Sequence, residues 1–320
     1  MGSRRRTAAI LAVAGLLAAA TACGSGEETQ TGTQVDEVAV GVIPIVDIAP
    51  LHLGTQKGFF SKRNIKLTLT EAQGGAAIVP GVVSDKFQFG FSNVTSLVLA
   101  RSKGLPVKIV ANGNNSTGTV RKDFGSVIVA EDSPIKRARD LEGKRVAINT
   151  LKNINESTVR AAVTADGGDE TKVKFVELPF PDIVPAIEKG EVDAGQVVEP
   201  FQTIGKQGGM REVAWNMAEP IQDLTVATYF TTEKQLKSDP ELVERFTAAV
   251  NESLAYAESH QDEARAVLPS YMKLDPKVAS ALTLPKWPTE VNRQSVQELA
   301  DLAAREKIID KPLDTGTLFP

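Results

Sequence analysis

The sequence predicts an α/β protein made of two lobes, each built on a doubly wound sheet. The first observation is a repeat. The tripeptide Ile-Val-Pro at 78–80 recurs at 183–185, and at the same offset Gly90 falls on Gly195. The second is that short apolar strands alternate with helices along both stretches, which is typical of parallel sheets. Because ligands of open α/β sheets bind beyond the carboxyl ends of the strands, two such facing halves predict a ligand cleft.

A third landmark lies at the same offset, where Val42-Ile43 of VGVIP falls on Ala147-Ile148 of VAINT. Each copy reads strand, loop, helix, strand, loop, helix, strand, loop. We interpret the pattern as two copies of one supersecondary unit. Coincidence is the alternative, since Ile, Val and Pro are common and any two βαβαβ units share rough spacing.

The first half begins with an apolar strand expected at 37–43, which ends at Pro44 because proline cannot donate to a sheet ladder. The Gly-Gly pair at 74–75 turns the chain into a helix and lets the backbone approach a ligand without a Cβ in the way. Asn93 belongs to a run of cap-forming residues that directs helix N–H groups at the strand ends. The expected order is helix 51–58, strand 64–71, helix 76–84, strand 87–91, helix 95–103, strand 107–111 and the polar run 112–115.

The second half is entered by a crossing strand at 125–130 and left by another at 223–231. Asp182 is expected to cap a helix at 183–189. Between the crossings we expect helix 133–142, strand 144–148, polar loop 149–156, helix 157–166, strand 173–178, helix 183–189 and strand 192–197.

The remaining chain is expected to be helical. Asp239-Pro240 and Asp275-Pro276 each place a cap before a first-turn proline, which is a helix start signal. Leu242 and Phe246 open an apolar face with a step of four, and a similar face runs through 295–306. We expect these helices to pack against the first half and to carry no chemistry of their own.

Residues 1–22 are expected to form a signal peptide. Three arginines at 4–6 precede an apolar run at 7–20, too short to span a bilayer but suited to a signal core. The small residues before Cys23 resemble the lipobox of bacterial lipoproteins, in which the cysteine is lipidated and becomes the mature N-terminus. Ala20 departs from that pattern, which usually has Leu there, and an ordinary secretory signal is the alternative. Residues 23–35 are then the lipidated cysteine and a flexible tether.

Composition excludes several classes of function. The chain has 320 residues, 42% hydrophobic and 24% charged, which suits a globular protein with two cores. Its net charge is −4, so its overall field does not attract nucleic acid or anionic lipid. One cysteine permits no internal disulfide. We expect no nucleic-acid partner and a monomer.

Several stretches carry a family resemblance. VAVGVIP, APLHLGTQKGFF, GGAAIVPGVV and FQFGFSNVTSL, together with DLEGKRVAINT and GEVDAGQVVEPF, resemble the substrate-binding proteins of ABC importers in the nitrate/sulfonate/taurine-type (thiamine-pyrimidine-like) group. The likeness covers roughly residues 36 to 260. It implies a type II periplasmic-binding-protein fold with two hinge crossings, closing over one small ligand. Lobe 1 is then 36–124 plus 228–320, and lobe 2 is 125–227.

The resemblance also implies the function. The protein is expected to capture a small organic solute, sulfonate- or taurine-like or a related heterocycle or acid. Its expected partners are a permease and an ATPase of an ABC importer, and the membrane through the lipid anchor. The expected location is the extracytoplasmic face of the cell membrane.

An enzyme on the same fold is one alternative, and a sensor lipoprotein without transport is another. No phosphate loop, HExxH zinc helix or cysteine-based metal site occurs in the sequence, so no cofactor or metal is expected. A triad of His52 with Ser92 would lack a nucleophile elbow. The sulfinate hydrolases and pyrimidine synthases that resemble the family rely on cysteine chemistry, whereas this chain has only Cys23. We expect no catalytic residue.

The candidate ligand-binding residues follow the predicted strands, and each could instead serve as a cap or turn. Asp47 and Glu199 form the sharper pair, because two inward carboxylates would repel nitrate and suit a zwitterionic, amine-bearing or heterocyclic ligand. Either could instead face solvent or cap a helix. The full set is Asp47, Gly75, Ala76, Ser92, Asn93, Thr95, Asn112, Gly113, Asn149, Asn153, Asn155, Phe180 and Glu199.

Overall fold

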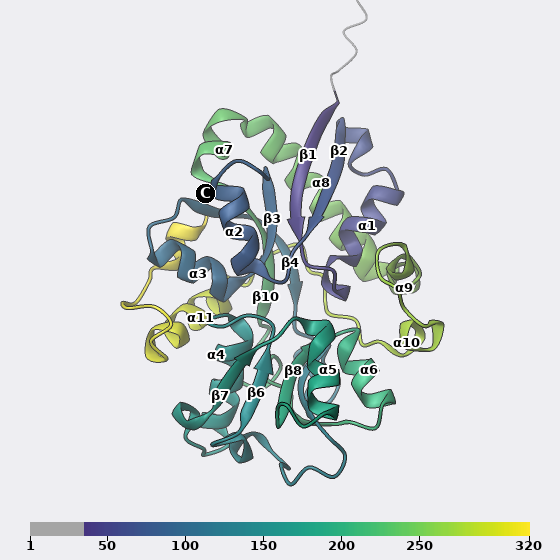
Figure 1. The fold of residues 1–320 in the computed structure, drawn as a ribbon. Helices are drawn as coiled ribbons and strands as arrows, with labels where there is room; N and C mark the ends of the chain where they lie inside the picture. Colours follow the sequence, from purple (N-terminus) through teal and green to yellow (C-terminus); the bar gives the residue numbers. More distant parts are fainter. Residues whose placement is uncertain (1–34) are drawn as a thin grey trace, which may run out of the picture. The chain divides into compact units, whose positions relative to one another are not determined.

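Two five-stranded sheets organise the computed structural model, which describes residues 35–320 (Figure 1). The first sheet has the order β2-β1-β3-β10-β4 and the second the order β7-β6-β8-β5-β9. The strands of the first sheet are β1 Asp36–Val42, β2 Ile65–Glu71, β3 Phe89–Asn93, β4 Val107–Asn115 and β10 Thr225–Thr232. Those of the second are β5 Gly125–Val129, β6 Arg145–Ile148, β7 Lys174–Glu177, β8 Ala194–Val198 and β9 Arg211–Ala214.

The helices that connect the parallel strands cover the faces of the sheets, as doubly wound folds require (Figure 1). In the first half these are α1 Ala49–Gln56, α2 Gly75–Val83 and α3 Val94–Ser102. In the second they are α4 Ile154–Ala165, α5 Phe180–Glu188 and α6 Phe201–Gln207. Short 3₁₀ turns occur at Val46–Ile48, Ser61–Arg63, Ala138–Leu141 and Glu170–Lys172.

The repeat seen in the sequence is present in the fold. Ile78 lies on α2 and Ile183 on α5, and each packs on a strand glycine of its own sheet. A Cβ on Gly90 would lie 2.6 Å from Ile78 Cγ2, and one on Gly195 would lie 2.2 Å from Ile183 Cγ2. Because such a contact is closer than carbon atoms tolerate, both strands require glycine where the isoleucine crosses.

The third landmark of the repeat is displaced by one residue. Gly41 pairs with Gly90 in the first sheet, and Ala147 pairs with Gly195 in the second. Ala147 is therefore equivalent to Gly41 and not to Val42 as the sequence alignment predicted. The two halves share their architecture, but the first strands differ by one position.

Each sheet contains one antiparallel strand donated by a crossing of the chain. β5 pairs antiparallel with β8 and β9 in the second sheet, and β10 pairs antiparallel with β3 and β4 in the first. The chain therefore passes twice between the sheets, before β5 and before β10. The lobe boundaries 36–124 plus 228–320 and 125–227 remain a prediction.

The C-terminal region contains α7 Glu233–Ser238, α8 Pro240–Ser259, α9 Gln261–Val267, α10 Pro276–Ala281 and α11 Arg293–Arg305, with 3₁₀ turns at Leu268–Ser270 and Thr315–Leu318. α8 packs on α1 and β4 of the first half, as expected. α11, however, contacts both α3 and α4, and α10 contacts α6. The predicted packing against the first half is therefore present for α8 and α11, and α10 and α11 also touch the second half, which was not predicted.

Several predicted boundaries need correction. The strand predicted at 107–111 continues to Asn115, so Asn112 and Gly113 lie in β4 and not in a loop. Asp182 does not cap its helix, because α5 already begins at Phe180 and places Asp182 in its first turn. The helix predicted at 133–142 is a single 3₁₀ turn, and α6 and β9 were not predicted. The signal peptide predicted at 1–22 and the lipidation predicted at Cys23 fall on residues outside those that the structure describes.

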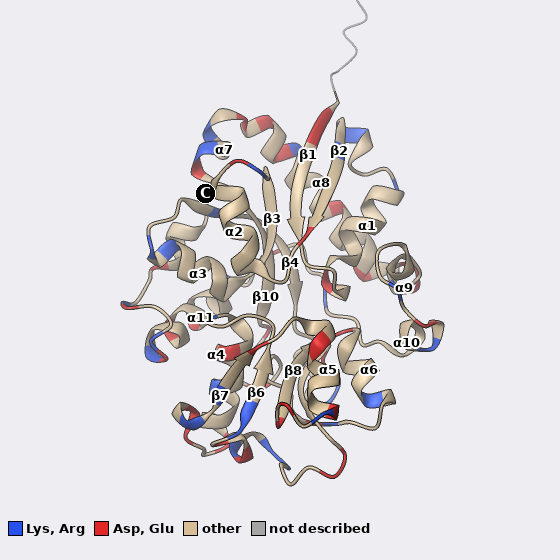
Figure 2. Ribbon diagram, in the orientation of Figure 1, with Lys and Arg blue, Asp and Glu red and all other residues tan. Residues whose placement is uncertain are grey.

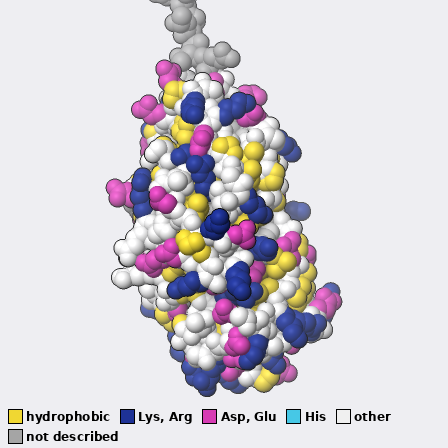
Figure 3. Space-filling view, turned by 90° about the vertical axis from the view of Figure 1, so that its left-hand side faces the viewer, with side chains coloured by type: hydrophobic (Ala, Val, Ile, Leu, Met, Phe, Trp, Pro, Cys, Tyr) yellow, Lys and Arg dark blue, Asp and Glu magenta, His cyan; other side chains and the backbone are white. Residues whose placement is uncertain are grey.

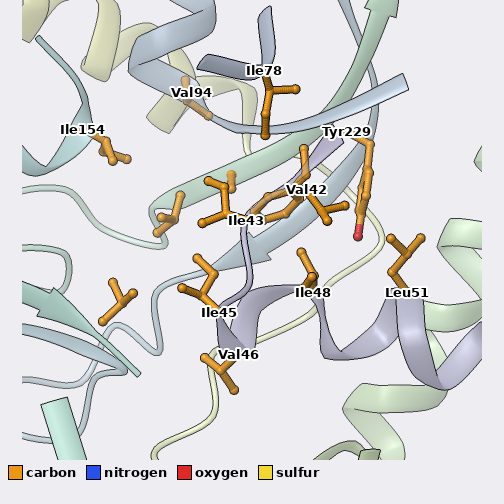
Figure 4. Packing of buried hydrophobic residues seen from close by; sticks show 14 of the residues in the cluster. Val42, Ile43, Ile45, Val46, Ile48, Leu51, Ile78, Val94, Ile154 and Tyr229 are labelled. Atoms are coloured by element: carbon orange, nitrogen blue, oxygen red, sulfur yellow. The ribbon is translucent and has the colours of Figure 1, made fainter. Parts of the chain in front are cut away.

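The core continues from the first sheet to the edge of the second. Side chains of β1, the following loop and α1 cluster together, with Ile154 of α4 nearby (Figure 4). Val42, Ile43, Ile45, Val46 and Ile48 are all buried. The loop after β1 is therefore held rigidly, and it carries Asp47. Within 35–320, no helix is both long and apolar enough to cross a membrane.

Candidate functional site

Two adjoining cavities lie between the sheets. The inner one has a volume of about 30 Å³, enough for about two water molecules. The outer one has about 320 Å³, at the lower end of ligand pockets in proteins. They share Ile43, Ile45 and Phe180, so they lie side by side. The inner lining is completed by Asp47, Phe91, Asn93, Asn149, Asn153, Ile154, Asn155, Val198, Met217, Val226 and Ala227.

Six of the thirteen predicted ligand-binding residues line the inner cavity, and they come from both halves. The first half supplies Asp47 and Asn93, and the second supplies Asn149, Asn153, Asn155 and Phe180. Each lies just past the carboxyl end of a strand or at the start of a helix. The geometry thus brings them together as open α/β sheets do. Their role in ligand binding remains a prediction.

Asp47 is a buried carboxyl group of this site, and burial disfavours its ionised form. Its side chain is only 3% exposed, and its Oδ1 has no hydrogen-bond partner in the part of the chain that the structure describes. Burial raises the pKa of Asp47 to about 7, an effect that the Asn114 carboxamide reduces and the Asp123 charge increases. Trp287 Nε1 donates to the main-chain oxygen of Asp47 at 3.2 Å, which holds the loop in place.

The three asparagines of the second half hydrogen-bond one another. Asn149 Oδ1 accepts from Asn153 Nδ2 at 2.7 Å and from Asn155 Nδ2 at 2.8 Å. Asn153 Oδ1 accepts from the backbone N–H groups of Asn155 and Glu156, so it caps α4. Asn153 Nδ2 also donates to Thr150 Oγ1 at 2.8 Å. The donors and acceptors of Asn153 are therefore used within the loop.

Hydrogen bonds join the two halves across the cleft. Gln73 Nε2 donates to the main-chain oxygen of Asn149 at 2.7 Å, and Asn149 Nδ2 donates back to the main-chain oxygen of Gln73 at 3.2 Å. Asn93 Oδ1 caps α3 by accepting from the Ser96 N–H at 2.9 Å, and it also accepts from the N–H of Ile154 at 3.4 Å. These bonds hold the loops after β2 and β3 against the loop after β6 and the start of α4.

The other predicted residues of the first half do not line either cavity. Gly75 begins α2 and packs against Ser92, while Ala76 is exposed on the same helix. Ser92 and Thr95 are buried, and Ser92 Oγ donates to the main-chain oxygen of Asn93. Asn112 and Gly113 are buried in β4, where Asn112 Nδ2 donates to the main-chain oxygen of Pro288 at 2.7 Å.

Glu199 is fully buried at the start of α6, but it does not line the cavities. Its carboxylate accepts from the Thr203 N–H at 3.0 Å, from Thr203 Oγ1 at 2.8 Å and from the Thr283 N–H at 3.0 Å. Burial raises its pKa, and these hydrogen bonds reduce the rise. The carboxylate thus accepts hydrogen bonds from the first turn of α6 and joins the segment at Thr283 to the second half. This is the helix-capping alternative that the sequence left open.

Apolar residues make up most of the lining that sequence reasoning missed. Ile43, Ile45, Phe91, Phe201 and Met217 line one cavity or the other. Phe201 stacks on Phe180 with ring centroids 5.9 Å apart. A periodicity analysis assigns such residues to the core, so only their place next to predicted loops could have marked them.

The histidine beside the cleft has no catalytic arrangement. His52 stacks on Tyr271 with ring centroids 3.8 Å apart, and burial lowers its pKa to about 4. Tyr271 Oη donates to the main-chain oxygen of Ile45. No hydrogen bond joins His52 to Ser92 among the described residues. The same part of the chain contains no cluster of three metal-ligating side chains.

Charge in the cleft is entirely negative. Among the described residues that line the two cavities, Glu71 and Asp47 are the charged ones, and none is Lys, Arg or His. Charged residues lie mainly on helices and loops outside the first sheet (Figure 2), and on one outer face both signs are interspersed (Figure 3).

Comparison with known proteins identifies a family that matches this chain. The family described as "NMT1/THI5 like" matches residues 45–264, more than half of the chain. Riboflavin-binding protein RibY from Chloroflexus aurantiacus is 27% identical over 255 residues, covering 77% of this chain and 69% of RibY. A 4-amino-5-hydroxymethyl-2-methylpyrimidine phosphate synthase from Aspergillus parasiticus is 25% identical over 224 residues, covering 65% of this chain and 62% of the enzyme.

Solved structures share the fold. The alkanesulfonate-binding protein SsuA from Xanthomonas axonopodis pv. citri, bound to MOPS, superposes with a TM-score of 0.76 at 16% identity. The match covers 90% of this chain and 99% of SsuA. The prediction of a two-sheet periplasmic-binding-protein fold is confirmed.

Proposed function

Because this chain belongs to the NMT1/THI5-like family, we propose that it is the extracytoplasmic solute-binding component of an ABC importer. It captures a small organic solute between its two halves and hands it to a permease and an ATPase. The observation that carries the proposal is the pair of adjoining cavities enclosed by residues of both sheets and bridged by Gln73 and Asn149. Such a site encloses a ligand by closure, which is how two-lobed binding proteins work.

The relatives support more than one solute class. RibY is named for riboflavin, and SsuA was solved with the sulfonate-bearing buffer MOPS. Heterocycles and sulfonates are therefore candidates that these relatives support, and taurine and nitrate are candidates from the sequence resemblance. The apolar lining of the outer cavity supports a solute with an organic body over an inorganic anion such as nitrate.

An enzyme is the second candidate, because the pyrimidine phosphate synthase is a relative. Mass spectrometry of the solute that copurifies with the protein separates the two. A binding protein releases that solute unchanged on denaturation and again after long incubation at 37 °C. Conversion of the bound solute into a new compound would reject the importer component in favour of an enzyme. Recovery of the protein with no solute, together with no binding in a broad screen, would favour a sensor.

The proposal includes a signal peptide at 1–22 and a lipid anchor on Cys23, which attach a monomer to the outer surface of the cell membrane. Its support is the order of arginines, apolar run, small residues and cysteine in the sequence. Cys23→Ser is expected to move the protein from the membrane fraction to the soluble fraction after secretion. A serine variant that fractionates with membranes as the wild type does would rule out the anchor.

A further inference from the structure

The polar side chains around the inner cavity differ in what they can still offer a ligand. Asn153 uses its carboxamide within its own loop, and Asn149 accepts two hydrogen bonds and donates one across the cleft. Asn93 uses its oxygen for two N–H groups and its Nδ2 for Ser96 Oγ. The hydrogen-bonding groups of these three predicted asparagines are therefore largely used in holding helices and loops together.

Two groups of the lining are less engaged: Asn155, which uses its Nδ2 but accepts no hydrogen bond on Oδ1 from residues 35–320, and the carboxyl group of Asp47. Asp47 lines the same cavity and is 3% exposed, and its Oδ1 accepts no hydrogen bond of ordinary geometry from residues 35–320, although the Asn114 carboxamide lies close enough to lower the pKa of the carboxyl group. A buried acceptor without a donor is costly, and beside a cavity a bound water, ion or ligand can complete it. In its ionised form the Asp47 carboxylate therefore lacks a hydrogen-bond donor.

The surroundings of Asp47 favour a donor that is also positively charged. The titratable groups that interact with it are Asp123, Tyr229 and Tyr271, and the pKa values of both tyrosines are raised by burial, with the Asp47 charge adding to the rise. The charged residues that line the two cavities are Asp47 and Glu71. An anionic head such as a sulfonate would meet a carboxylate here with no cation to balance it.

The outer cavity indicates the size and polarity of the rest of the solute. Its lining is mostly apolar, with Ile43, Pro44, Ile45, Phe180 and Phe201, and it adjoins the inner cavity, with which it shares three residues. With about 320 Å³ it accommodates a small apolar or aromatic body, whereas the inner cavity of about 30 Å³ accommodates only a small polar head.

We infer that this cleft takes a solute with a cationic N–H head, a primary ammonium or an amidinium, which pairs with Asp47 while an apolar or aromatic body fills the outer cavity. This assignment rests on the proposed function, since it names the solute class of the same cleft. It separates this chain from sulfonate binders of the same fold. Asp47 is the specificity-determining residue.

The pairing has a pH signature. Asp47 must be ionised to bind a cation, and burial raises its pKa to about 7. The affinity for an amidinium, which keeps its charge throughout, should therefore increase about tenfold between pH 6 and pH 8. A head held by neutral hydrogen bonds alone would show no such increase.

The test uses two matched sets of probes: benzamidine, benzamide and benzenesulfonate on one body, and hexylamine and hexanesulfonate on another. Calorimetry and thermal shift are measured with the purified wild type, with Asp47→Asn and with Asp132→Asn, which removes an exposed carboxylate beyond β5. Benzamidine or hexylamine should bind the wild type and Asp132→Asn alike. Asp47→Asn should bind the same probe at least about thirtyfold more weakly, as loss of a buried charge pair implies.

Each outcome is decisive. A sulfonate that binds the wild type better than its cationic partner overturns the inference and leaves the proposed function standing. Cation binding that Asp47→Asn retains within threefold, or that does not change between pH 6 and 8, also overturns it. If no probe of either class binds at millimolar concentration, the inference fails, and the copurifying solute still decides the proposed function by its own chemistry. The pH series on the wild type decides the matter even if Asp47→Asn does not fold.

Discussion

Replacement of Asp47 by Asn should change how the stability of the ligand-free protein depends on pH. Burial raises the pKa of this carboxyl from 3.8 to about 7 in the folded protein. Below about pH 4 both the folded and the unfolded chain hold the proton, so Asp47 costs nothing. Between pH 4 and pH 7 the unfolded chain has released the proton and the folded chain keeps it. The free energy of unfolding therefore falls as pH rises, and the loss is complete above pH 7.

The magnitude follows from the difference in pKa. Each unit corresponds to about 1.4 kcal/mol, so ionised Asp47 lowers the free energy of unfolding by about 4 kcal/mol at high pH. About 2–3 kcal/mol of that loss falls between pH 5 and pH 8. Asp47→Asn removes the ionisation, although its amide brings a pH-independent cost of about 1–3 kcal/mol if the added N–H has no acceptor. The difference between variant and wild type should therefore grow in favour of the variant as pH rises.

Urea unfolding at pH 5, 6.5 and 8, followed by the fluorescence of buried Trp287, measures this difference directly. The other acids with raised pKa values, Asp123, Glu199 and Glu306, are present in both proteins and cancel in the comparison. The exposed control Asp132→Asn should give a flat difference. A difference for Asp47→Asn that changes by less than about 0.5 kcal/mol from pH 5 to 8 would refute the reasoning, because the carboxyl would then titrate alike in both states.

Two further perturbations test how the halves are held together. Gln73→Ala removes the donor to the Asn149 main-chain oxygen. The affinity for benzamidine should therefore fall about threefold, and scattering at saturating benzamidine should show a larger radius of gyration than the wild type. An unchanged affinity and radius would show that this hydrogen bond contributes nothing to closure. Glu306 follows α11, which contacts α4, and burial raises its pKa to about 8, with Glu156 and Glu170 adding to the rise. A buried acid with a raised pKa makes the folded protein less stable as pH rises, because the folded chain keeps a proton that the unfolded chain releases. Glu306→Gln should therefore raise the thermal midpoint at pH 8.5 but not at pH 5. Equal shifts at both pH values would contradict this.

The repeated part of the fold was predictable because its constraint is local. Ile78 and Ile183 cross strand glycines, so the same residue types had to recur at nearly the same spacing. The first strands of the two halves do not follow the offset of 105 residues that separates Ile78 from Ile183. Their register is set by pairing with a neighbouring strand, and the sequence does not show that pairing. β9, with four residues, carries too short a pattern to show alternation.

The site was predictable only in its position. Sequence reasoning expected ligand groups after the strands, and Asp47 and Asn93 do lie there. It could not separate a ligand group from a cap, because the distinction depends on distant partners. Asn93 meets Ile154 across the cleft, and Glu199 meets Thr283 from a segment more than eighty residues away. Only the folded chain shows that Asp47 has no such partner for its Oδ1 among the described residues.

The unpaired carboxylate also supplies a reason for closure to depend on the solute. In this structure Asp47 is buried, and its ionised form costs about 4 kcal/mol above pH 7. That energy corresponds to roughly a thousandfold bias against closure whenever opening re-exposes the carboxylate. A cationic head removes the bias by neutralising the charge, whereas an anionic head increases it. If the chain is the importer component that we propose, this difference would make closure depend on the solute, and the Asp47 carboxyl group would supply it.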